Sequence, residues 1–461
     1  MPARRIRVAP AAAMQEGFEA IRREAGVPAE FAPDALAEAQ RAATAAAPTG
    51  ERIDVPFVTI DPPESRDLDQ AVHIERSGGG HRVRYAIADV GAFVAPGAPV
   101  DREAQGRGVT VYAPDRKAPL HPPVLSEGAA SLLPGEWRPA VVWTLDLDAT
   151  GELTAASVDR ATVRSAAQHT YADVPPDVEP LLREVGEHRM EIERRRGAVR
   201  LNVPEQEVVR DGDGWTVSYR TPLDTEEWNA QISLLTGMAA AQLMLGAGVG
   251  ILRTQPHADE RALQRLRRQA FALRVPWPGD MSYPDFLRSL DPSLAAHAAL
   301  MHEATGVGQG AGYTAFDGEA PAEPAHFAIA APYAHATAPL RRLQDRYVSE
   351  CCLAAQAGTE PPGWVRAALP ALPAAMQAGD RRARSVERGV VDLVEAVLLS
   401  GREGERFDAV VIDDGVVQLR DMAVRGALEG DARPEPGAEV CVRLVAADTA
   451  ARKVVFAVAG G

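Results

Sequence analysis

The period of the hydrophobic pattern changes twice along the chain, and this change restricts the fold more than any other feature. Residues 53 to about 165 read as strands, with turn sequences such as "DATGE" between apolar runs. Residues 179–400 carry long amphipathic segments of helical period, and short strands return after Gly404. A strand block, a helix block and a second strand block predict an α+β chain with more than one domain.

The two ends of the chain predict small units outside the central block. Near the N-terminus, "MQEGFEAIRREAG" has an amphipathic helix pattern that stops at Gly26. The five short strands predicted after Gly404 occupy fewer than 60 residues, which is typical of an OB-type barrel. The predicted boundaries are 1–50 for a short helical region, 51–400 for the main domain and 404–461 for the small barrel.

Composition places the chain among soluble globular proteins. It has 461 residues, no run of 18 apolar residues and no signal-peptide pattern, and its three cysteines lack metal-type spacing. We therefore expect a protein of the reducing cytoplasm without membrane association. The formal charge of −15 argues against a surface that binds polyanions everywhere, but allows a basic channel.

Nearly all positive charges are arginines, because lysine occurs only at positions 117 and 453. Codon bias is the simpler explanation. The consequence is nevertheless physical, since a guanidinium can hold a phosphate group with two hydrogen bonds.

A cluster of acids follows the first predicted strand, in "TIDPPESRDLDQAVHIE". Asp61 ends the strand because two prolines follow it, and Asp67 and Asp69 point the same way if their backbone is extended. Three converging carboxylates need a positive partner, and such oxygen-rich clusters suit Mg²⁺ or Mn²⁺. The alternative reading is a calcium-like loop or a solvated turn.

A second motif, "YAHATAPLRRLQDRY" at 333–347, predicts a phosphate site. Thr337 reads as the N-cap of a helix, which would place Arg341 and Arg342 near the positive end of the helix dipole. An anion bound there would resolve the unfavourable placement. The alternative is that Arg341 simply pairs with Asp345, four residues later.

Glu387 is the third unusual residue. It shares one predicted helix face with three apolar positions, 391, 394 and 398. A charge in such a place needs a partner. Either it pairs with a neighbouring arginine or it faces a functional site.

Together these residues resemble the ribonuclease II/R (RNB) family of hydrolytic exoribonucleases. The first family signature is a strand ending in Ile-Asp followed by Asp-x-Asp-Asp, which "TIDPPESRDLDQA" matches at all but its last acid. The second signature resembles "YAHATAPLRRLQD", and the segments "YAIADV" and "RGVTVYAPDRKAPLHPPVLSEGAASLLPGE" resemble the blocks between them. The resemblance covers residues 51 to 400. It implies an RNB-type catalytic domain, a mixed sheet surrounded by helices, together with a C-terminal OB-fold that binds RNA.

The resemblance also implies a role for each matching residue. Asp61, Asp67 and Asp69 would hold Mg²⁺, with Mn²⁺ as a possible substitute. Arg341 would bind the scissile phosphate, and Glu387 would lie near the leaving end as a further catalytic residue. Tyr112 would hold the terminal nucleotide, although a structural tyrosine is the default reading of that position alone. The residues expected to contact RNA are Tyr112, His335, Thr337, Arg341 and Arg342.

The implied activity is processive 3′→5′ hydrolysis of single-stranded RNA to nucleoside 5′-monophosphates. We expect a monomer that takes an RNA 3′ end and needs no small-molecule cofactor. A third reading, a hydrolase of small nucleotides or sugar phosphates, fits the long arginine-rich helical region less well.

Two departures from the family pattern matter. Gln70 stands where the family usually has a fourth aspartate; its amide oxygen could still ligate Mg²⁺, but without the charge. The substitution motivates the alternative of a non-catalytic, RNA-binding family member. The family also usually carries cold-shock-type barrels at the N-terminus, whereas residues 1–50 are short and helical.

Overall fold

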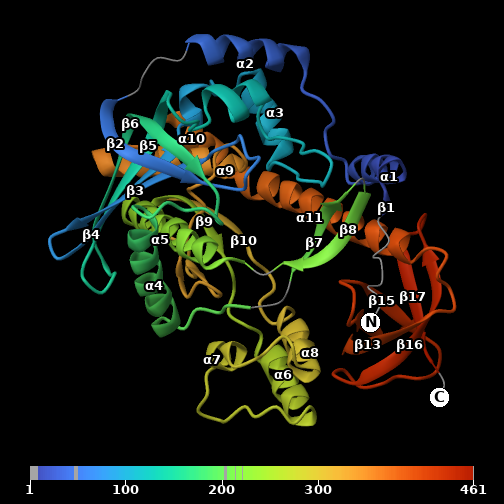
Figure 1. Cartoon of the computed structure of the whole chain (residues 1–461). Helices are drawn as coiled ribbons and strands as arrows, with labels where there is room; N and C mark the ends of the chain where they lie inside the picture. The colour runs from blue at the N-terminus through green and yellow to red at the C-terminus, as the bar shows by residue number, and fades with distance from the viewer. Residues whose placement is uncertain (1–8, 46–49, 202–204, 213, 221, 460–461) are drawn as a thin grey trace.

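The computed structural model describes residues 9–45, 50–201, 205–212, 214–220 and 222–459. Residues 1–8 and 46–49 of the predicted N-terminal region, and residues 460–461 of the predicted barrel, lie outside the described part. Two β-barrels stand apart, with most of the helices between and around them (Figure 1). The predicted α+β class is confirmed.

The first barrel is the sheet that carries the acid cluster. Its strands close in the order β2-β3-β4-β5-β6, and it is mixed because β2 and β6 run parallel while the other neighbours run antiparallel. Side chains alternate between two cores: Tyr85 joins the large central core and Ala86 joins a smaller one on the opposite face. The strands are β2 Glu51–Ile60, β3 Gln70–Ser77, β4 Gly80–Ala88, β5 Trp137–Leu147 and β6 Leu153–His169.

Short helices cover one end of this barrel. The two described helices of the N-terminal region are α1 (Ala11–Glu24) and α2 (Pro33–Ala45), which confirms a helical N-terminus. In Figure 1, α2 lies over the barrel beside α3, whereas α1 packs against the long helix α11. The short elements here are α3 Pro99–Arg107, the 3-10 helix η1 Val90–Ala92 and the π-helical turn η2 Leu125–Ala129.

Long helices form the body between the barrels. The longest, α11, runs from the first barrel to the C-terminal barrel (Figure 1). By length and apolar composition α5 could cross a membrane, but 56% of its apolar window is buried inside the protein, against α4 and α9. It therefore behaves as a core helix. The body helices are α4 Glu179–Arg195, α5 Asp224–Ala247, α9 Leu343–Ala357, α10 Gly363–Ala368 and α11 Leu372–Leu399.

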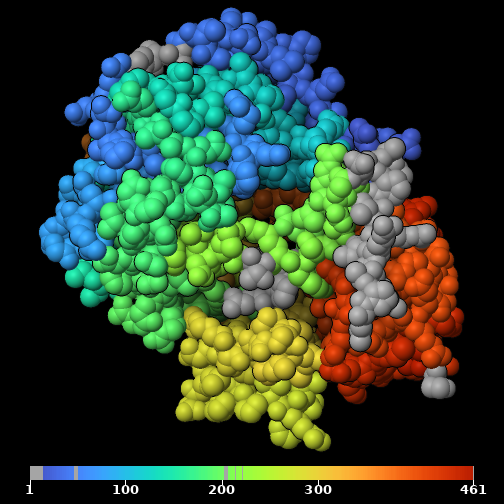
Figure 2. All heavy atoms as spheres, in the orientation of Figure 1, coloured from blue at the N-terminus to red at the C-terminus, as the bar shows by residue number. Residues whose placement is uncertain are grey.

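A group of three helices with its own small core projects from this body. In Figure 2 it is the yellow part of the surface, beside the red C-terminal barrel. Its core includes Leu266, Phe286 and Leu300, one from each helix. The helices are α6 Glu260–Ala272, α7 Tyr283–Arg288 and α8 Ala295–Ala304.

The C-terminal barrel closes in the order β13-β14-β15-β17-β16, as an OB-type unit requires. Its core centres on Phe456 and Val411, and receives Leu399 from the end of α11. The strands are β13 Arg406–Asp413, β14 Val416–Leu419, β15 Arg425–Glu429, β16 Glu439–Asp448 and β17 Lys453–Val458.

Small sheets connect these units. One is three-stranded in the order β1-β8-β7, and the other two are two-stranded, β10-β9 and β11-β12. The strands are β1 Ala9–Pro10, β7 Glu205–Asp211, β8 Gly214–Arg220, β9 Val249–Thr254, β10 Gly312–Asp317, β11 Ala325–His326 and β12 Ala331–Pro332.

Candidate active site

The three acids lie on the connection between the first two strands of the first barrel. Asp61 directly follows β2, and its backbone N–H donates to His169 O at the end of β6 (3.0 Å). Asp69 directly precedes β3, and Leu68 between the two later acids is fully buried. The alternation predicted from an extended backbone therefore anchors the loop through Leu68 and leaves Asp67 and Asp69 on its other side.

Asp69 is buried against the arginine motif. Its Oδ1 accepts the backbone N–H of Leu340 (2.7 Å), and its Oδ2 accepts Nε of Arg341 (3.2 Å). Burial raises the pKa of Asp69 to about 7, although Arg341 and the Leu340 N–H act in the opposite direction. Asp69 thus joins the two predicted motifs across 271 residues of sequence.

Asp61 supplies an unused oxygen to the same place. Its Oδ2 is buried and accepts no hydrogen bond. Burial raises the pKa of Asp61 to about 6; the charge of Arg341 lowers it, and the charge of Asp67 raises it further. A buried carboxylate oxygen without a donor is an energetic cost that a bound cation would remove.

Asp67 is held by two residues of the segment after α3. Lys117 Nζ lies 2.6 Å from its Oδ1 and also 3.1 Å from Glu127 Oε1, and the Tyr112 hydroxyl donates to its Oδ2 (3.1 Å). Sequence analysis did not assign Lys117 or Glu127 to the site. The rarity of lysine was the available signal, because one of only two lysines in the chain contacts the acid cluster.

Both polar groups of the Gln70 side chain form hydrogen bonds with protein atoms. Its Nε2 donates to the backbone oxygen of Thr337 (2.5 Å), and its Oε1 accepts the hydroxyl of Tyr85 (2.7 Å). The hydroxyl of Ser233 is 2.8 Å from that of Tyr85 and completes the chain of contacts. Gln70 therefore ties β3 to the arginine motif, and sequence analysis missed Tyr85 and Ser233 as its partners.

The arginine motif differs from its predicted form. The helix expected from Thr337 begins only at Leu343, and the residues before it form a turn. The N–H of Leu340, which an N-cap at Thr337 would have accepted, donates instead to the carboxylate of Asp69 (2.7 Å). The prediction of Thr337 as an N-cap was wrong, and Thr337 is instead a buried residue that holds Gln70.

The two arginines of the motif have separate partners. Arg342 pairs with Asp345 (Nη2 to Oδ1, 2.7 Å), whereas Arg341 pairs with Asp69 through Nε. The alternative in which Arg341 simply pairs with Asp345 is thereby excluded. The side chain of Arg341 is 45% exposed, so its terminal nitrogens can reach a ligand.

A cavity of about 260 Å³ opens in front of Arg341. Four other residues predicted for the site line it: Tyr112, His335, Arg342 and Glu387. Glu387 is exposed on α11, and no ion pair involves it in the described part of the chain, so it faces a site rather than an arginine partner.

Residues that the sequence did not indicate complete the cavity wall. The guanidinium of Arg253 lies over the ring of Tyr313 (4.4 Å), whose hydroxyl donates to Asp380 (3.2 Å). The ring of His335 meets Tyr313 edge to face (5.9 Å), and burial holds the pKa of His335 well below its ordinary value. The wall is therefore aromatic and cationic, with a neutral imidazole.

The three acids offer hard oxygen donors of the kind that a divalent cation prefers, but Asp67 already pairs with Lys117 and Asp69 with Arg341. Among the described residues, no three His, Cys, Asp or Glu side chains are grouped as a ready-made metal site. Among the three acids, these pairings leave the buried Oδ2 of Asp61 as an oxygen without a hydrogen-bond partner, and it is a hard donor of the kind that Mg²⁺ or Mn²⁺ prefers.

Comparison with known proteins decides the family. The RNB domain family matches residues 52–355, and the family of RNase II-type exonuclease C-terminal S1 domains matches residues 405–459. The chain belongs to the RNB family. This membership confirms the resemblance read from the acid and arginine motifs.

The relatives of this RNB protein include proteins named as nucleases and one named as an inactive exonuclease. Ribonuclease R of Escherichia coli (strain K12) is 43% identical over 122 residues, which is 26% of this chain and 15% of that protein. Ribonuclease R of Helicobacter pylori is 27% identical over 339 residues, 68% of this chain and 51% of the relative. Two Arabidopsis thaliana proteins, "DIS3-like exonuclease 2" and "Inactive exonuclease DIS3L2", are each 28% identical over 344 residues, 66% of this chain and 32% of theirs. The chain thus matches 15–51% of the length of these relatives.

Solved structures agree with the fold. The apo form of Mycoplasma genitalium RNase R has a TM-score of 0.85 at 17% identity and covers 97% of this chain and 78% of that one. Yeast Ssd1, a pseudonuclease, has a TM-score of 0.66 at 15% identity and covers 82% of this chain and 50% of that one. Similarity of fold therefore does not distinguish an active nuclease from an inactive one. The contacts of the site residues are the evidence that bears on activity.

Proposed function

We propose that this RNB protein is an active, Mg²⁺-dependent exoribonuclease that degrades single-stranded RNA processively from the 3′ end to nucleoside 5′-monophosphates. The observation that carries the proposal is the direct contact between the acid loop and the arginine motif, through Asp69 and Arg341. A chain that had lost catalysis would have no need to keep a buried acid with a raised pKa beside an exposed guanidinium.

Each residue has a role that its surroundings support. Arg341 uses only Nε to hold Asp69, so its terminal nitrogens are free to bind the scissile phosphate with two hydrogen bonds. Asp61 and Asp69 would hold the cation, which when bound polarises the phosphate and lowers the pKa of a water molecule. Asp67 orients Lys117 and the Tyr112 hydroxyl.

The cavity wall supports a terminal nucleotide as ligand. Tyr112 is 50% exposed, so one side of its ring is open to a base or ribose. Tyr313 and the guanidinium of Arg253 offer further flat surfaces on the opposite elements. Such surfaces accept any base, which suits an enzyme that removes nucleotides without regard to sequence. We also propose that the protein acts as a monomer in the cytoplasm.

The direct test uses a 5′-labelled single-stranded RNA of about 20 nucleotides, long enough to occupy a channel and protrude. With Mg²⁺, we expect a ladder of products shortened from the 3′ end and the release of nucleoside 5′-monophosphates. EDTA should stop the reaction. RNA that is bound but never shortened at any Mg²⁺ or Mn²⁺ concentration would contradict the proposal.

The rival function is RNA binding without catalysis, and two observations favour it. Gln70 brings no charge to the cluster, and Lys117 already neutralises one acid. The rival predicts RNA affinity that is the same in EDTA and in Mg²⁺, together with an unchanged RNA length in the assay above.

A further inference from the structure

The outer face of α6 is strongly basic in an acidic protein. The stretch from Glu260 to Trp277 contains five arginines and one acid, although the chain as a whole carries −15. All five arginines are exposed, and in the described part of the chain none of them forms an ion pair. They are Arg261, Arg265, Arg267, Arg268 and Arg274.

Some exposed arginines elsewhere in the protein are neutralised by a carboxylate. Arg194 pairs with Glu191 (2.7 Å), and Arg366 pairs with Asp317 (2.7 Å). The arginines of α6 and of the turn after it form no ion pair with a described carboxylate, and a polyanion is the complementary partner for their charge.

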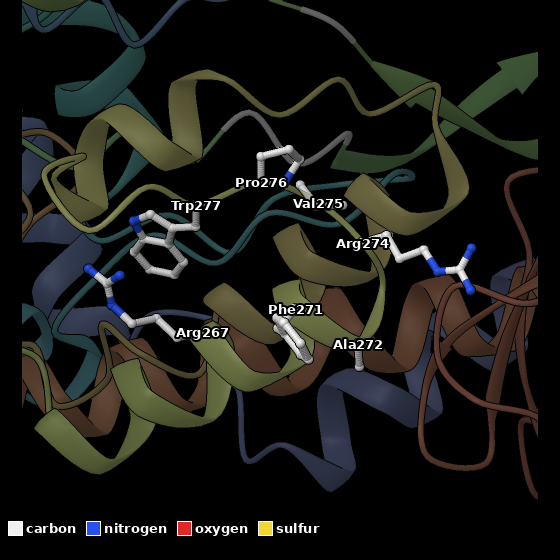
Figure 3. A pocket seen from close by; sticks show the side chains of 7 residues that line it. All are labelled: Arg267, Phe271, Ala272, Arg274, Val275, Pro276 and Trp277. Carbon is white, nitrogen blue, oxygen red and sulfur yellow. The ribbon is translucent and has the colours of Figure 1, made fainter.

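Flat side chains accompany these charges (Figure 3). The ring of Trp277 stacks on Phe286 (3.9 Å between ring centroids, 1° between planes), and the guanidinium of Arg267 lies over Trp277 at 4.2 Å. The indole N–H donates to Met281 O (3.0 Å), which fixes the ring. The stack ends at the exposed guanidinium plane of Arg267, on which a further flat group can be placed.

Phe271 supplies a second flat surface on the same side. It is 87% exposed, and it follows Arg267 by one helical turn, so the two side chains are neighbours on the helix. Both line a surface hollow of about 680 Å³ together with Arg274 and Trp277 (Figure 3). An exposed phenylalanine has no stabilising role in the free protein, because it leaves its apolar surface in water.

The end of α6 keeps an arginine where the backbone favours glycine. Arg274 has φ +58, directly after the helix, and the N–H of Val275 closes the turn on Ala270 O (2.9 Å). Glycine is the usual residue at this position of a helix-ending turn. Arg274 lies at the edge of the hollow, where its charge adds to that of the α6 arginines.

We propose that this face of α6 is a second binding site for single-stranded RNA, separate from the catalytic cavity. Phosphates would contact the unpaired arginines, and bases would stack on Phe271 and on the guanidinium plane of Arg267. The two sites share no lining residue. The α6 site also adjoins the C-terminal barrel, since a Cβ placed on Gly437 would meet Leu273 at 2.6 Å. The inference rests on the proposed function only in taking RNA as the partner.

Binding in EDTA tests the site without requiring cleavage. Fluorescence anisotropy would measure the Kd of two single-stranded RNAs, of about 30 and about 6 nucleotides, the shorter of which can occupy only one site. For the longer RNA we expect Phe271→Ala to raise the Kd about fivefold or more. The triple variant Arg265→Ala, Arg267→Ala, Arg268→Ala should raise it about tenfold or more and reduce the salt dependence. The Kd of the shorter RNA, bound in the catalytic cavity, should stay within about twofold.

The control removes arginines that are equally exposed but paired, in Arg194→Ala and Arg366→Ala, and should leave both Kd values unchanged. An unchanged Kd for the longer RNA in the α6 variants would overturn the proposal. An equal loss of inorganic polyphosphate binding, with no effect of Phe271→Ala, would also overturn it, because the face would then bind anions without bases.

Photo-crosslinking gives an answer even if a variant folds poorly. The unaltered protein is irradiated with the longer RNA carrying 5-iodouridine, and the crosslinked peptides are sequenced. Crosslinks at residues 267–277 support the site, and crosslinks confined to the catalytic cavity contradict it. Failure of the proposed function would appear separately, as absence of cleavage in Mg²⁺ with these binding results intact.

Discussion

Lys117 sets the charge of the acid cluster. Its ammonium group lies between Asp67 and Glu127, at 2.6 and 3.1 Å. Its positive charge therefore offsets part of the negative charge that Asp67 and Glu127 bring. The cluster formed by Asp61, Asp67 and Asp69 consequently carries less negative charge than its carboxylates alone suggest.

Replacing Lys117 tests this reading. Lys117→Met should tighten the binding of Mn²⁺ to the RNA-free protein by about three- to tenfold, because an uncompensated Asp67 attracts the cation more strongly. Isothermal titration calorimetry would measure the change. Lys453→Met removes the other lysine, which is exposed on β17 of the C-terminal barrel, and should have no effect. Equal Mn²⁺ affinities for all three proteins would show that Lys117 does not influence the cation.

Gln70 makes two hydrogen bonds with protein atoms. An aspartate there has no N–H for the Thr337 carbonyl, and its side chain is one methylene shorter, which weakens the contact with Tyr85. Gln70→Asp should lower the Mg²⁺ concentration needed for half-maximal cleavage, because it adds a carboxylate to the cluster. It should also lower the Tm, because the Thr337 carbonyl loses its partner and the contact with Tyr85 weakens, at a cost of about 1–3 kcal/mol. Gln70→Ala removes the same contacts without the charge. If both variants needed the same Mg²⁺ concentration, a ligand role at position 70 would be ruled out.

At the scale of elements, a buried acid on α11 joins this helix to β7 and to the C-terminal barrel. Glu395 is 5% exposed, and its Oε1 accepts Nε2 of Gln206 (2.7 Å) and the N–H of Arg425 (2.8 Å). Burial raises the pKa of Glu395 from about 4.5 to about 7, against these hydrogen bonds. Protonation of this carboxyl is thus coupled to folding.

The raised pKa of Glu395 makes the free energy of unfolding depend on pH. Between pH 4.5 and 7 the folded protein binds the proton of Glu395 more tightly than the unfolded chain, so this group's contribution to stability falls as pH rises through that window and stays low above it. Glu395→Gln should therefore gain stability relative to the parent from pH 5 to pH 8, by about 2–3 kcal/mol at most. Calorimetric Tm values across this range would measure it, with exposed Glu429→Gln as control. A constant Tm difference at every pH would contradict the assignment.

The elements near the site show what sequence can and cannot predict. The blocks of strands and helices, the acid loop and the arginine motif followed from periodicity and spacing. The start of α9 did not, because Asp69, distant in sequence, accepts the Leu340 N–H that an N-cap at Thr337 would have accepted. The partners of Gln70 and Asp67 were not predicted either. Tyr85 contacts Gln70 from the neighbouring strand β4, and Lys117 contacts Asp67 from a loop 50 residues later in the sequence.

At the scale of the whole molecule, α1 links the acid site to the C-terminal barrel. Arg22 on α1 is 5% exposed and holds Asp115 with two hydrogen bonds (2.6 and 2.9 Å), in the segment between Tyr112 and Lys117. Two residues further on, at the C-terminal end of the same helix, Glu24 pairs with Arg452 of the barrel (2.7 Å). The short N-terminal region therefore braces the loop that reaches Asp67.

Arg22→Ala should lower both stability and the cleavage rate, although Arg22 lies outside the acid cluster. Loss of a buried partner for Asp115 should cost about 3 kcal/mol of stability and lower the cleavage rate, because Tyr112 and Lys117 lose their support. Arg23→Ala, an exposed neighbour on the same helix, is the matched control. Thermal unfolding and the cleavage assay would be run together. A normal rate in a destabilised Arg22→Ala protein would show that α1 stabilises the fold but not the site.

The central claim is that the acids beside Arg341 perform the cleavage while other surfaces hold the RNA. The most direct measurement compares Asp69→Asn with the parent and with Asp54→Asn, an exposed acid of β2, in single-turnover cleavage and in RNA binding without metal. We predict that Asp69→Asn reduces the cleavage rate by at least about a hundredfold, since it removes the negative charge of a cation ligand, and leaves the RNA Kd within about twofold. Cleavage by Asp69→Asn at the parent rate would contradict the account.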